Sequence, residues 1–254
     1  MTSNKFGFRK SLMPALRNTG LAAIACVLCS TSLLAQGVPK KWESQKYQPP
    51  FSLGTPDNLS QGGTRSGADQ DLGPRLLPLV PQDHNFGVTT EAYPSFLVYV
   101  PEFTNQPNVD TLEFLLLDEE GAEVYRARFN VQLNNQVLRI DLPKFAGLSP
   151  LEEGKNYLWL LEGFTQDFSL SETLFAHGWV RRVPRSEKLV ESLNANEDVV
   201  AQANVYIREQ IWYDAIALLE EGFAEGTASS AVIEQWDALL QSAGVTDVAI
   251  QSDN

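Results

Sequence analysis

The chain has 254 residues, with 19 basic and 32 acidic side chains, a formal net charge of −13, two cysteines and two histidines. This acidity argues against nucleic acid or anionic lipid as a partner, because a phosphate-binding surface needs clustered lysine and arginine. With so few cysteines and histidines, a transition-metal site would have to be built mostly from carboxylates.

Residues 1–35 predict a secretory signal peptide. They hold four basic residues and no acids, and the apolar run Leu21 to Leu28 follows the basic part. That run is shorter than the roughly 20 residues that span a bilayer, so cleavage after Ala35 is favoured over a retained anchor. Lipid attachment at Cys26 fits poorly, because Ala23 stands where a leucine is expected. We expect an exported protein, periplasmic or extracellular, which would contact a membrane only if the signal segment were retained.

Cleavage after residue 35 would leave a chain without cysteine, because Cys26 and Cys29 both lie in the signal segment. The remaining chain has 15 basic and 32 acidic residues, a net charge of −17. An exported domain without disulfides needs a full-sized hydrophobic core.

Residues 36–79 predict a disordered linker, because proline and glycine recur along them and few residues could be buried. Trp42, Tyr47 and Phe51 stand in this stretch at intervals. Two interpretations are open for these aromatic residues. Either they are incidental or pack onto the folded domain, or they anchor a partner.

Residues 80–183 predict an immunoglobulin-like antiparallel β-sandwich. Short segments rich in β-branched and aromatic residues recur about every ten residues, with no helical period between them. Turn residues such as those of "DEEG" (Asp118 to Gly121) separate the segments. The predicted strands cover 95–101, 111–118, 123–129, 137–143, 157–164 and 174–183.

The stretch "LEEGKNYLW" indicates a structural motif rather than an active site. Leu151, Gly154 and Tyr157 have the layout of a tyrosine corner, in which the phenol hydrogen-bonds to backbone a few residues upstream. Glu152 and Glu153 then lie on the exposed turn. A catalytic carboxylate pair needs burial that a turn rarely provides.

Residues 184–246 predict a small helical appendage, and 247–254 a flexible tail. Apolar residues recur at helical spacing, Asn196 is the expected N-cap of the second helix, and Gly222 and Gly244 are expected to end helices. The stretch around "IWYDAI" is similar to a single tetratricopeptide unit, which predicts a helical hairpin.

The helical segment is also the most acidic part of the chain, with 13 acids against three basic residues from residue 184 onward. Two interpretations are open for its aromatic residues Trp212, Tyr213 and Trp236. Packing is one, since burying such rings stabilises a small core. The other is a surface for a partner protein, of which these three residues are the candidates.

No catalytic, metal or cofactor site is predicted. The patterns "GxSxG", "HExxH", "GxxxxGK[ST]" and "GxGxxG" do not occur. A dyad of His84 and His177 would require the ends of the sheet domain to meet. The stretch "DQDLG" (Asp69 to Gly73) is similar to the start of a calcium loop, but Pro74 and Val80 occupy the positions where an EF-hand needs glycine and glutamate.

Several phrases occur together in order, among them "GGTRSG", "TTEAYPSFLVYVP", "LLLDEEGAEVYRARF", "LEEGKNYLW", "GWVRRV" and "IWYDAIALL". Together they resemble the exported cyanobacterial proteins catalogued as domain of unknown function 928, from about Gly62 to Gly244. The resemblance implies architecture and compartment, and no catalytic residue. The resemblance implies a cysteine after the glycine-rich phrase and another after the strand that here reads "YLWLLEGF". This chain has "SGADQD" and "TQDFSL" at these two places. A covalent tie between linker and sandwich is therefore not expected here.

The leading hypothesis is a non-enzymatic, exported binding or assembly module of the cell envelope, with an unknown envelope protein as partner. One alternative is a carboxylate-dependent hydrolase of envelope polysaccharide, with two acids flanking the bond in a groove. A second alternative is calcium-dependent adhesion. The candidate acids for the hydrolase are Glu152, Glu153, Glu162 and Asp167.

Overall fold

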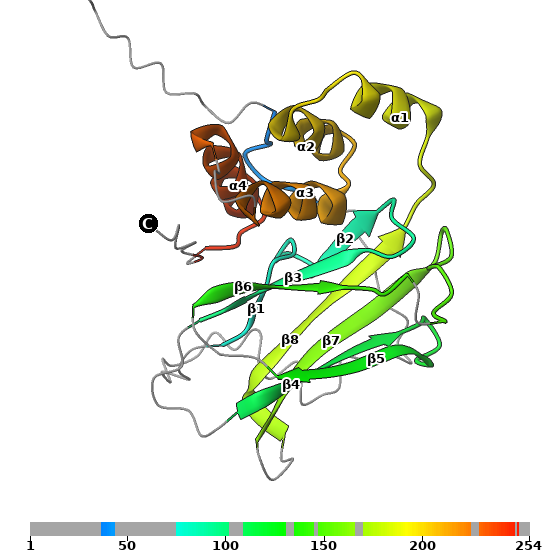
Figure 1. Cartoon of the computed structure of the whole chain (residues 1–254), viewed down its shortest axis with the longest axis vertical. Helices are drawn as coiled ribbons and strands as arrows, with labels where there is room; N and C mark the ends of the chain where they lie inside the picture. The colour runs from blue at the N-terminus through cyan, green and yellow to red at the C-terminus, as the bar shows by residue number, and fades with distance from the viewer. Residues whose placement is uncertain are drawn as a thin grey trace, which may run out of the picture. The chain divides into compact units, whose positions relative to one another are not determined.

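The computed structural model describes residues 37–43, 75–101, 109–130, 135–144, 147–165, 170–224, 229–246 and 248. Within these residues the chain forms eight strands and four helices in one compact unit, and it is mainly β (Figure 1). The predicted signal peptide, and the tail apart from residue 248, lie outside the described residues. Over the described ranges, no helix has the length and apolar character needed to cross a membrane.

The smaller sheet has three antiparallel strands in the order β1-β3-β6. These strands are β1 (Leu77–Pro78), β3 (Ser95–Val100) and β6 (Gln136–Asp141). Strand β3 is the central strand, and its residues from Phe96 to Val100 are all buried. Burial of five consecutive residues fits the near-continuous apolar run in the sequence of this strand.

The larger sheet has five strands in the order β2-β8-β7-β4-β5. They are β2 (Phe86–Thr89), β8 (Leu170–Arg182), β7 (Asn156–Thr165), β4 (Val109–Leu117) and β5 (Glu123–Asn130). Gly121, with φ of 82°, lies in the tight turn between β4 and β5, where a side chain would strain the backbone. Strand β2 pairs in parallel with β8. The prediction of a wholly antiparallel fold is therefore wrong at this edge.

The two sheets share a hydrophobic core, to which strands β4 and β7 of the larger sheet contribute alternate residues. On β7, Tyr157, Trp159 and Leu161 belong to this core. The Trp159 ring lies 5.5 Å from that of Phe96 on the smaller sheet. The intervening β7 residues contribute to a second apolar cluster on the opposite face of the larger sheet. That cluster comprises Phe86, Val88, Leu158, Leu160 and Trp179.

The turn before β7 has the hydrogen bond that the tyrosine-corner layout implies. The Tyr157 hydroxyl accepts a hydrogen bond of 3.0 Å from the backbone N–H of Glu152. Leu151 is buried at 2% exposure, and Gly154 has a φ of 80°, which favours glycine. This arrangement fixes the turn and leaves Glu152 and Glu153 exposed on it.

Four helices follow the last strand, and Figure 1 shows them gathered at one end of the sheets. They are α1 (Glu187–Asn194), α2 (Val199–Arg208), α3 (Trp212–Ala224) and α4 (Ser230–Ser242). Asp198 caps α2 by accepting from two backbone N–H groups, so the prediction of Asn196 as N-cap is wrong. Helix α3 also continues past Gly222 to Ala224, whereas Gly244, with φ of 75°, follows the end of α4 as predicted.

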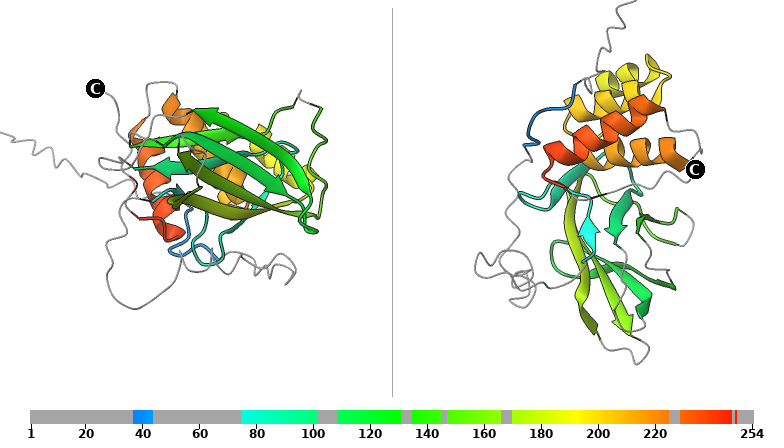
Figure 2. Two further views of the ribbon diagram at one scale, coloured as in Figure 1. Left: turned by 90° about the horizontal axis from the view of Figure 1, so that it is seen from below. Right: turned by 90° about the vertical axis from the view of Figure 1, so that its left-hand side faces the viewer.

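Helix α3 packs directly on the sheets, so the helical segment is not a separate appendage. Its residues Trp212 and Tyr213 belong to the same core cluster as Trp159. The hydroxyl of Tyr213 accepts a hydrogen bond of 2.8 Å from Nε1 of Trp159 and donates one of 3.0 Å to the carbonyl oxygen of Trp179. The views of Figure 2 also place the helices against one end of the sheets.

Two parts of the predicted linker belong to the folded unit. Residues 75–79 contribute strand β1, and Leu76 and Leu79 are buried at 3% and 1% exposure. Residues 37–43 form a strap on the helices, in which Trp42 is 3% exposed and lies edge-on to Trp212 at 4.9 Å. The prediction that all of 36–79 is disordered is therefore corrected at both ends, while Tyr47 and Phe51 lie outside the described residues.

Candidate functional site

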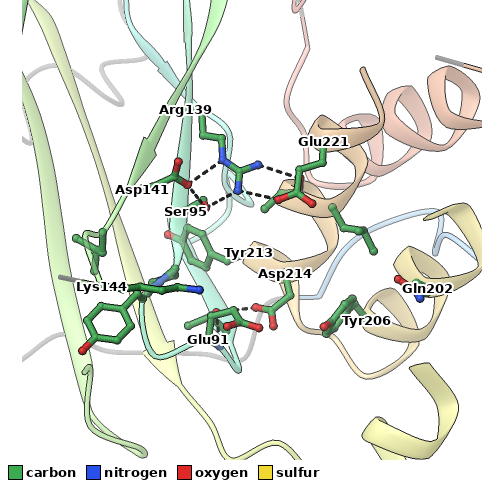
Figure 3. A pocket seen from close by; sticks show the side chains of 16 residues that line it. Glu91, Ser95, Arg139, Asp141, Lys144, Gln202, Tyr206, Tyr213, Asp214 and Glu221 are labelled. Carbon is green, nitrogen blue, oxygen red and sulfur yellow. Dashed lines mark hydrogen bonds and ion pairs between the residues drawn. The ribbon is translucent and has the colours of Figure 1, made fainter. Parts of the chain in front are cut away.

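A cleft of about 460 Å³ lies where helices α2 and α3 meet the sheets (Figure 3). Its walls come from four segments: the connection from β2 to β3, the end of β6, helix α2 and helix α3. The lining combines tyrosines with carboxylates, an arginine and a lysine. Because these segments are far apart in sequence, the cleft exists only when the helices are docked on the sheets.

A buried carboxylate ties helix α3 to the end of β2 beside this cleft. Asp214, in the first turn of α3, is only 7% exposed. It accepts hydrogen bonds from the hydroxyls of Thr89 (2.6 Å) and Thr90 (2.5 Å) and from the Thr90 backbone N–H (3.2 Å). Burial raises the pKa of Asp214 to about 6, with a further contribution from Glu91, while the threonine hydrogen bonds act in the opposite direction. We call these contacts the aspartate clasp.

An arginine ties the same helix to β6. Arg139 donates hydrogen bonds to Glu220 (2.8 Å) and Glu221 (2.9 Å) on α3 and to Asp141 (2.8 Å) on its own strand. A fourth bond, of 2.9 Å, reaches the hydroxyl of Ser95 on β3. Burial alone would lower the pKa of Arg139, but its bonds to Glu220 and Asp141 raise it. Figure 3 shows this arginine clasp spanning from the sheet to Glu221.

A third bridge joins the segment after β8 to the cleft wall. One nitrogen of Arg185 lies 2.8 Å from Glu91 and 2.8 Å from the hydroxyl of Tyr206 on α2. Burial raises the pKa of Tyr206, and the charge of Asp214 acts in the same direction. The hydroxyl of Tyr93 donates to the carbonyl oxygen of Leu148 at 3.0 Å. The three tyrosines that line the cleft, Tyr93, Tyr206 and Tyr213, are thus all held by their hydroxyl groups.

The three aromatic residues predicted as a partner surface are part of the interior. Trp212, Tyr213 and Trp236 are 0%, 2% and 0% exposed. Trp212 donates from Nε1 to the carbonyl oxygen of Leu79 at 2.9 Å, and Trp236 lies edge-on to Phe223 at 5.4 Å. The packing interpretation therefore holds, and the prediction of a partner surface at these residues is corrected. Rings buried to this extent present almost no area to another protein, although Tyr213 borders the cleft.

The structure does not bring together the three predicted acids that it describes, Glu152, Glu153 and Glu162. Glu152 and Glu153 lie on the exposed turn before β7, with Glu153 3.5 Å from Arg182, and Asp167 lies outside the described residues. Glu162 instead lies on β7 opposite Glu113 of β4. Burial raises the pKa of Glu162, and the charge of Glu113 adds to this effect.

The chain segments that hold His84 and His177 lie close together, but the residue that contacts His177 is Asn85, the neighbour of His84. Asn85 Nδ2 lies 3.3 Å from His177 Nε2, while His84 lies 3.9 Å from Asp83. His177 also stacks on Phe175, and burial lowers its pKa. This environment fits a packed neutral imidazole better than a catalytic dyad.

The alternative of calcium binding finds no support in the described part of the chain. Among those residues, no group of three or more His, Cys, Asp or Glu side chains is arranged to hold a metal ion. Asp118, in the "DEEG" turn, accepts hydrogen bonds from the backbone N–H groups of Glu120 (3.0 Å) and Ala122 (2.8 Å), which is a turn contact. The "DQDLG" stretch lies outside the described residues.

The residues that build the cleft were not found from the sequence. Thr89 is the last residue of strand β2 and Thr90 follows it, and this strand was not predicted from the sequence. Asp214, in the first turn of helix α3, was not singled out either. One signal was nevertheless present. The phrases "TTEAYP" and "IWYDAI", both used for the family resemblance, meet at the aspartate clasp.

These observations define a mainly β protein of two facing sheets whose helices close over a polar, tyrosine-lined cleft. The family model described as Domain of Unknown Function (DUF928) matches residues 60–252, and the chain belongs to this family. The resemblance inferred from the sequence is thus confirmed at the level of the family. No curated protein matches the chain.

Proposed function

We propose that this protein is an exported, non-enzymatic binding or assembly module of the cell envelope, and that its partner enters the cleft between α3 and the sheets. The cleft itself is the observation that supports this function. Its volume of about 460 Å³ falls within the usual range of ligand sites, roughly 300 to 1,000 Å³. The basic, apolar and cleavage-site segments of residues 1–35 support export.

A binding role fits the cleft better than a catalytic one, because its most buried charged groups are committed to holding α3. Asp214 receives three donors from Thr89 and Thr90, and Arg139 donates to three carboxylates. A catalytic acid or base must instead reach the substrate proton. The clasps keep the walls of the cleft in a fixed arrangement, and preorganisation of this kind lowers the entropic cost of binding.

The proposal includes an immunoglobulin-like arrangement of the sheets and a tetratricopeptide-like helix pair. Strand β7 starts at the tyrosine corner and lies between β8 and β4, as strand F lies between strands G and C in that fold. In the other sheet β3 pairs with β6, as strand B pairs with strand E. Helices α2 and α3 carry the fully buried Ala203 and Ala215, small residues of the kind that lets two helices approach closely.

The test is a pull-down from native envelope extract with the chain from Gln36 as bait. Truncation after Arg185 is unsuitable, because it would remove Trp212 and Tyr213 from the shared core. Ala217→Phe is a better variant, since Ala217 lies on α3 and lines the cleft. The matched control is Ala231→Phe, at a similarly half-buried position on α4.

We expect Ala217→Phe to lose a partner that the wild-type chain and Ala231→Phe both retain, with all three proteins melting at similar temperatures. Equal capture by all three would show that the cleft is not the binding site. Capture of nothing specific by the wild-type chain would count against the binding module itself.

A second candidate function has one specific observation in its favour. Glu162 and Glu113 are cross-strand neighbours, and the raised pKa of Glu162 is the property expected of a general acid. Glu113, however, is 3% exposed and bound by Arg126 and Arg128, which limits its access to a substrate. Hydrolysis of envelope polysaccharide by the wild-type chain, lost in Glu162→Gln, would support the hydrolase over the binding module.

A further inference from the structure

The charges around the cleft leave it negative. Four acids line it, namely Glu91, Asp141, Asp214 and Glu221, against the two bases Arg139 and Lys144. Arg139 is already surrounded, because Glu220 adds a third carboxylate to its contacts with Asp141 and Glu221. A positive group that enters the cleft is therefore attracted more strongly than a negative one.

Two carboxylates at the rim of the cleft have capacity to accept further hydrogen bonds. Glu91 contacts Arg185 through Oε1, and Glu221 contacts Arg139 through Oε1. The Oε2 atom of each takes part in neither contact. Their side chains are 45% and 57% exposed, so a ligand can reach them without breaking the clasps.

The half-buried ring of Tyr93 in the lining adds a second attraction for cations. It is anchored through its hydroxyl, which donates to the carbonyl oxygen of Leu148. An anchored ring offers its negatively polarised face to an ammonium or guanidinium group at little entropic cost. The other two tyrosines of the lining, Tyr206 and Tyr213, are 7% and 2% exposed and offer little of their faces. A carboxylate ligand would gain nothing from the face of Tyr93.

We propose that the cleft binds the cationic side chain of a lysine or arginine in a peptide segment of its partner. This inference rests on the proposed function, since it names the chemistry of the ligand that the cleft takes. A single long basic side chain with its adjacent backbone fits a volume of about 460 Å³. A bare metal ion fits less well, because among the described residues no group of three or more ligating side chains is arranged to hold one.

The experiment is calorimetric titration of the chain from Gln36 with blocked tri-lysine and tri-glutamate peptides at low salt. The cleft variants are Glu91→Gln and Glu221→Gln, which remove one charge each and keep the shape. The matched control is Glu191→Gln, an exposed acid on α1 that does not line the cleft.

We expect tri-lysine to bind and tri-glutamate not to bind. Each cleft variant should weaken tri-lysine binding about threefold and the double variant about tenfold, the range that partly exposed ion pairs support. Glu191→Gln should bind as the wild type does. Thermal melting of each variant establishes that it is folded.

Three outcomes would overturn the proposal: binding of tri-glutamate as tight as that of tri-lysine, no binding of either peptide, or an equal loss in Glu191→Gln and the cleft variants. The last outcome would mean that the overall acidity of the chain attracts the peptide. If Ala217→Phe loses the envelope partner while tri-lysine fails to bind, the binding module stands and only the class of ligand is wrong.

Discussion

The aspartate clasp makes a prediction about how stability depends on pH. Burial raises the pKa of Asp214 from 3.8 to about 6, so the folded chain binds this proton more tightly than the unfolded chain. Between pH 4 and 6 the folded state therefore carries more protons, and the free energy of unfolding falls as pH rises. A difference of about two pKa units corresponds to about 3 kcal/mol. The stabilisation is fully present below pH 4 and lost above pH 6.

The variant that isolates this effect is Asp214→Asn, which keeps the shape and removes the titration. An asparagine amide is a weaker hydrogen-bond acceptor for the Thr90 N–H, so the stability of the variant will differ from that of the wild type at every pH. The informative quantity is therefore how that difference changes with pH. Relative to Asp214→Asn, we expect the wild type to lose about 3 kcal/mol of unfolding free energy between pH 4 and pH 7.

Urea denaturation followed by tryptophan fluorescence from pH 4 to 7.5 measures this difference, and all five tryptophans are buried reporters of folding. A wild type that instead gains stability over the variant as pH rises would refute the reasoning. That result would mean that the hydrogen bonds from Thr89 and Thr90 outweigh the cost of burying the carboxylate, so that the pKa is lowered.

Three further substitutions test the fold by equilibrium unfolding. Tyr157→Phe should lower the free energy of unfolding by about 1 kcal/mol, because it removes the hydrogen bond to Glu152. An unchanged unfolding midpoint would mean that the tyrosine corner does not stabilise the fold. Trp42→Ala should cost about 3 kcal/mol or more, because a buried ring is lost; a cost near zero would mean that the strap contributes no packing. Gly87→Ala should cost about 1 to 3 kcal/mol, because the new Cβ would lie 2.8 Å from the Tyr213 ring, and neutral behaviour would show that α3 can shift away from β2.

The local elements of this protein could be predicted because their patterns are local. Short segments rich in β-branched and aromatic residues, separated by turn residues, marked β3, β4, β5, β6, β7 and β8. The helices were visible from their 3.6-residue period, and Tyr157 was assigned from its spacing to Leu151 and Gly154. Strands β1 and β2 were missed because, at two and four residues, they are too short to establish a period.

The sequence by itself determined the mainly β class of structure and the acidity, because composition and short-range spacing carry both. It also indicated the family, through phrases that resemble those of its members. Only the tertiary structure decided which aromatic residues are interior and where the cleft lies. Asp214 and Thr89 are 125 positions apart, and Arg139 and Glu220 are 81 apart. No local pattern relates such distant residues. These residues meet only because α3 docks against the sheets, and burial of the whole core decides that docking. The same packing buries Trp212 and Tyr213, which were candidate surface residues, in the core.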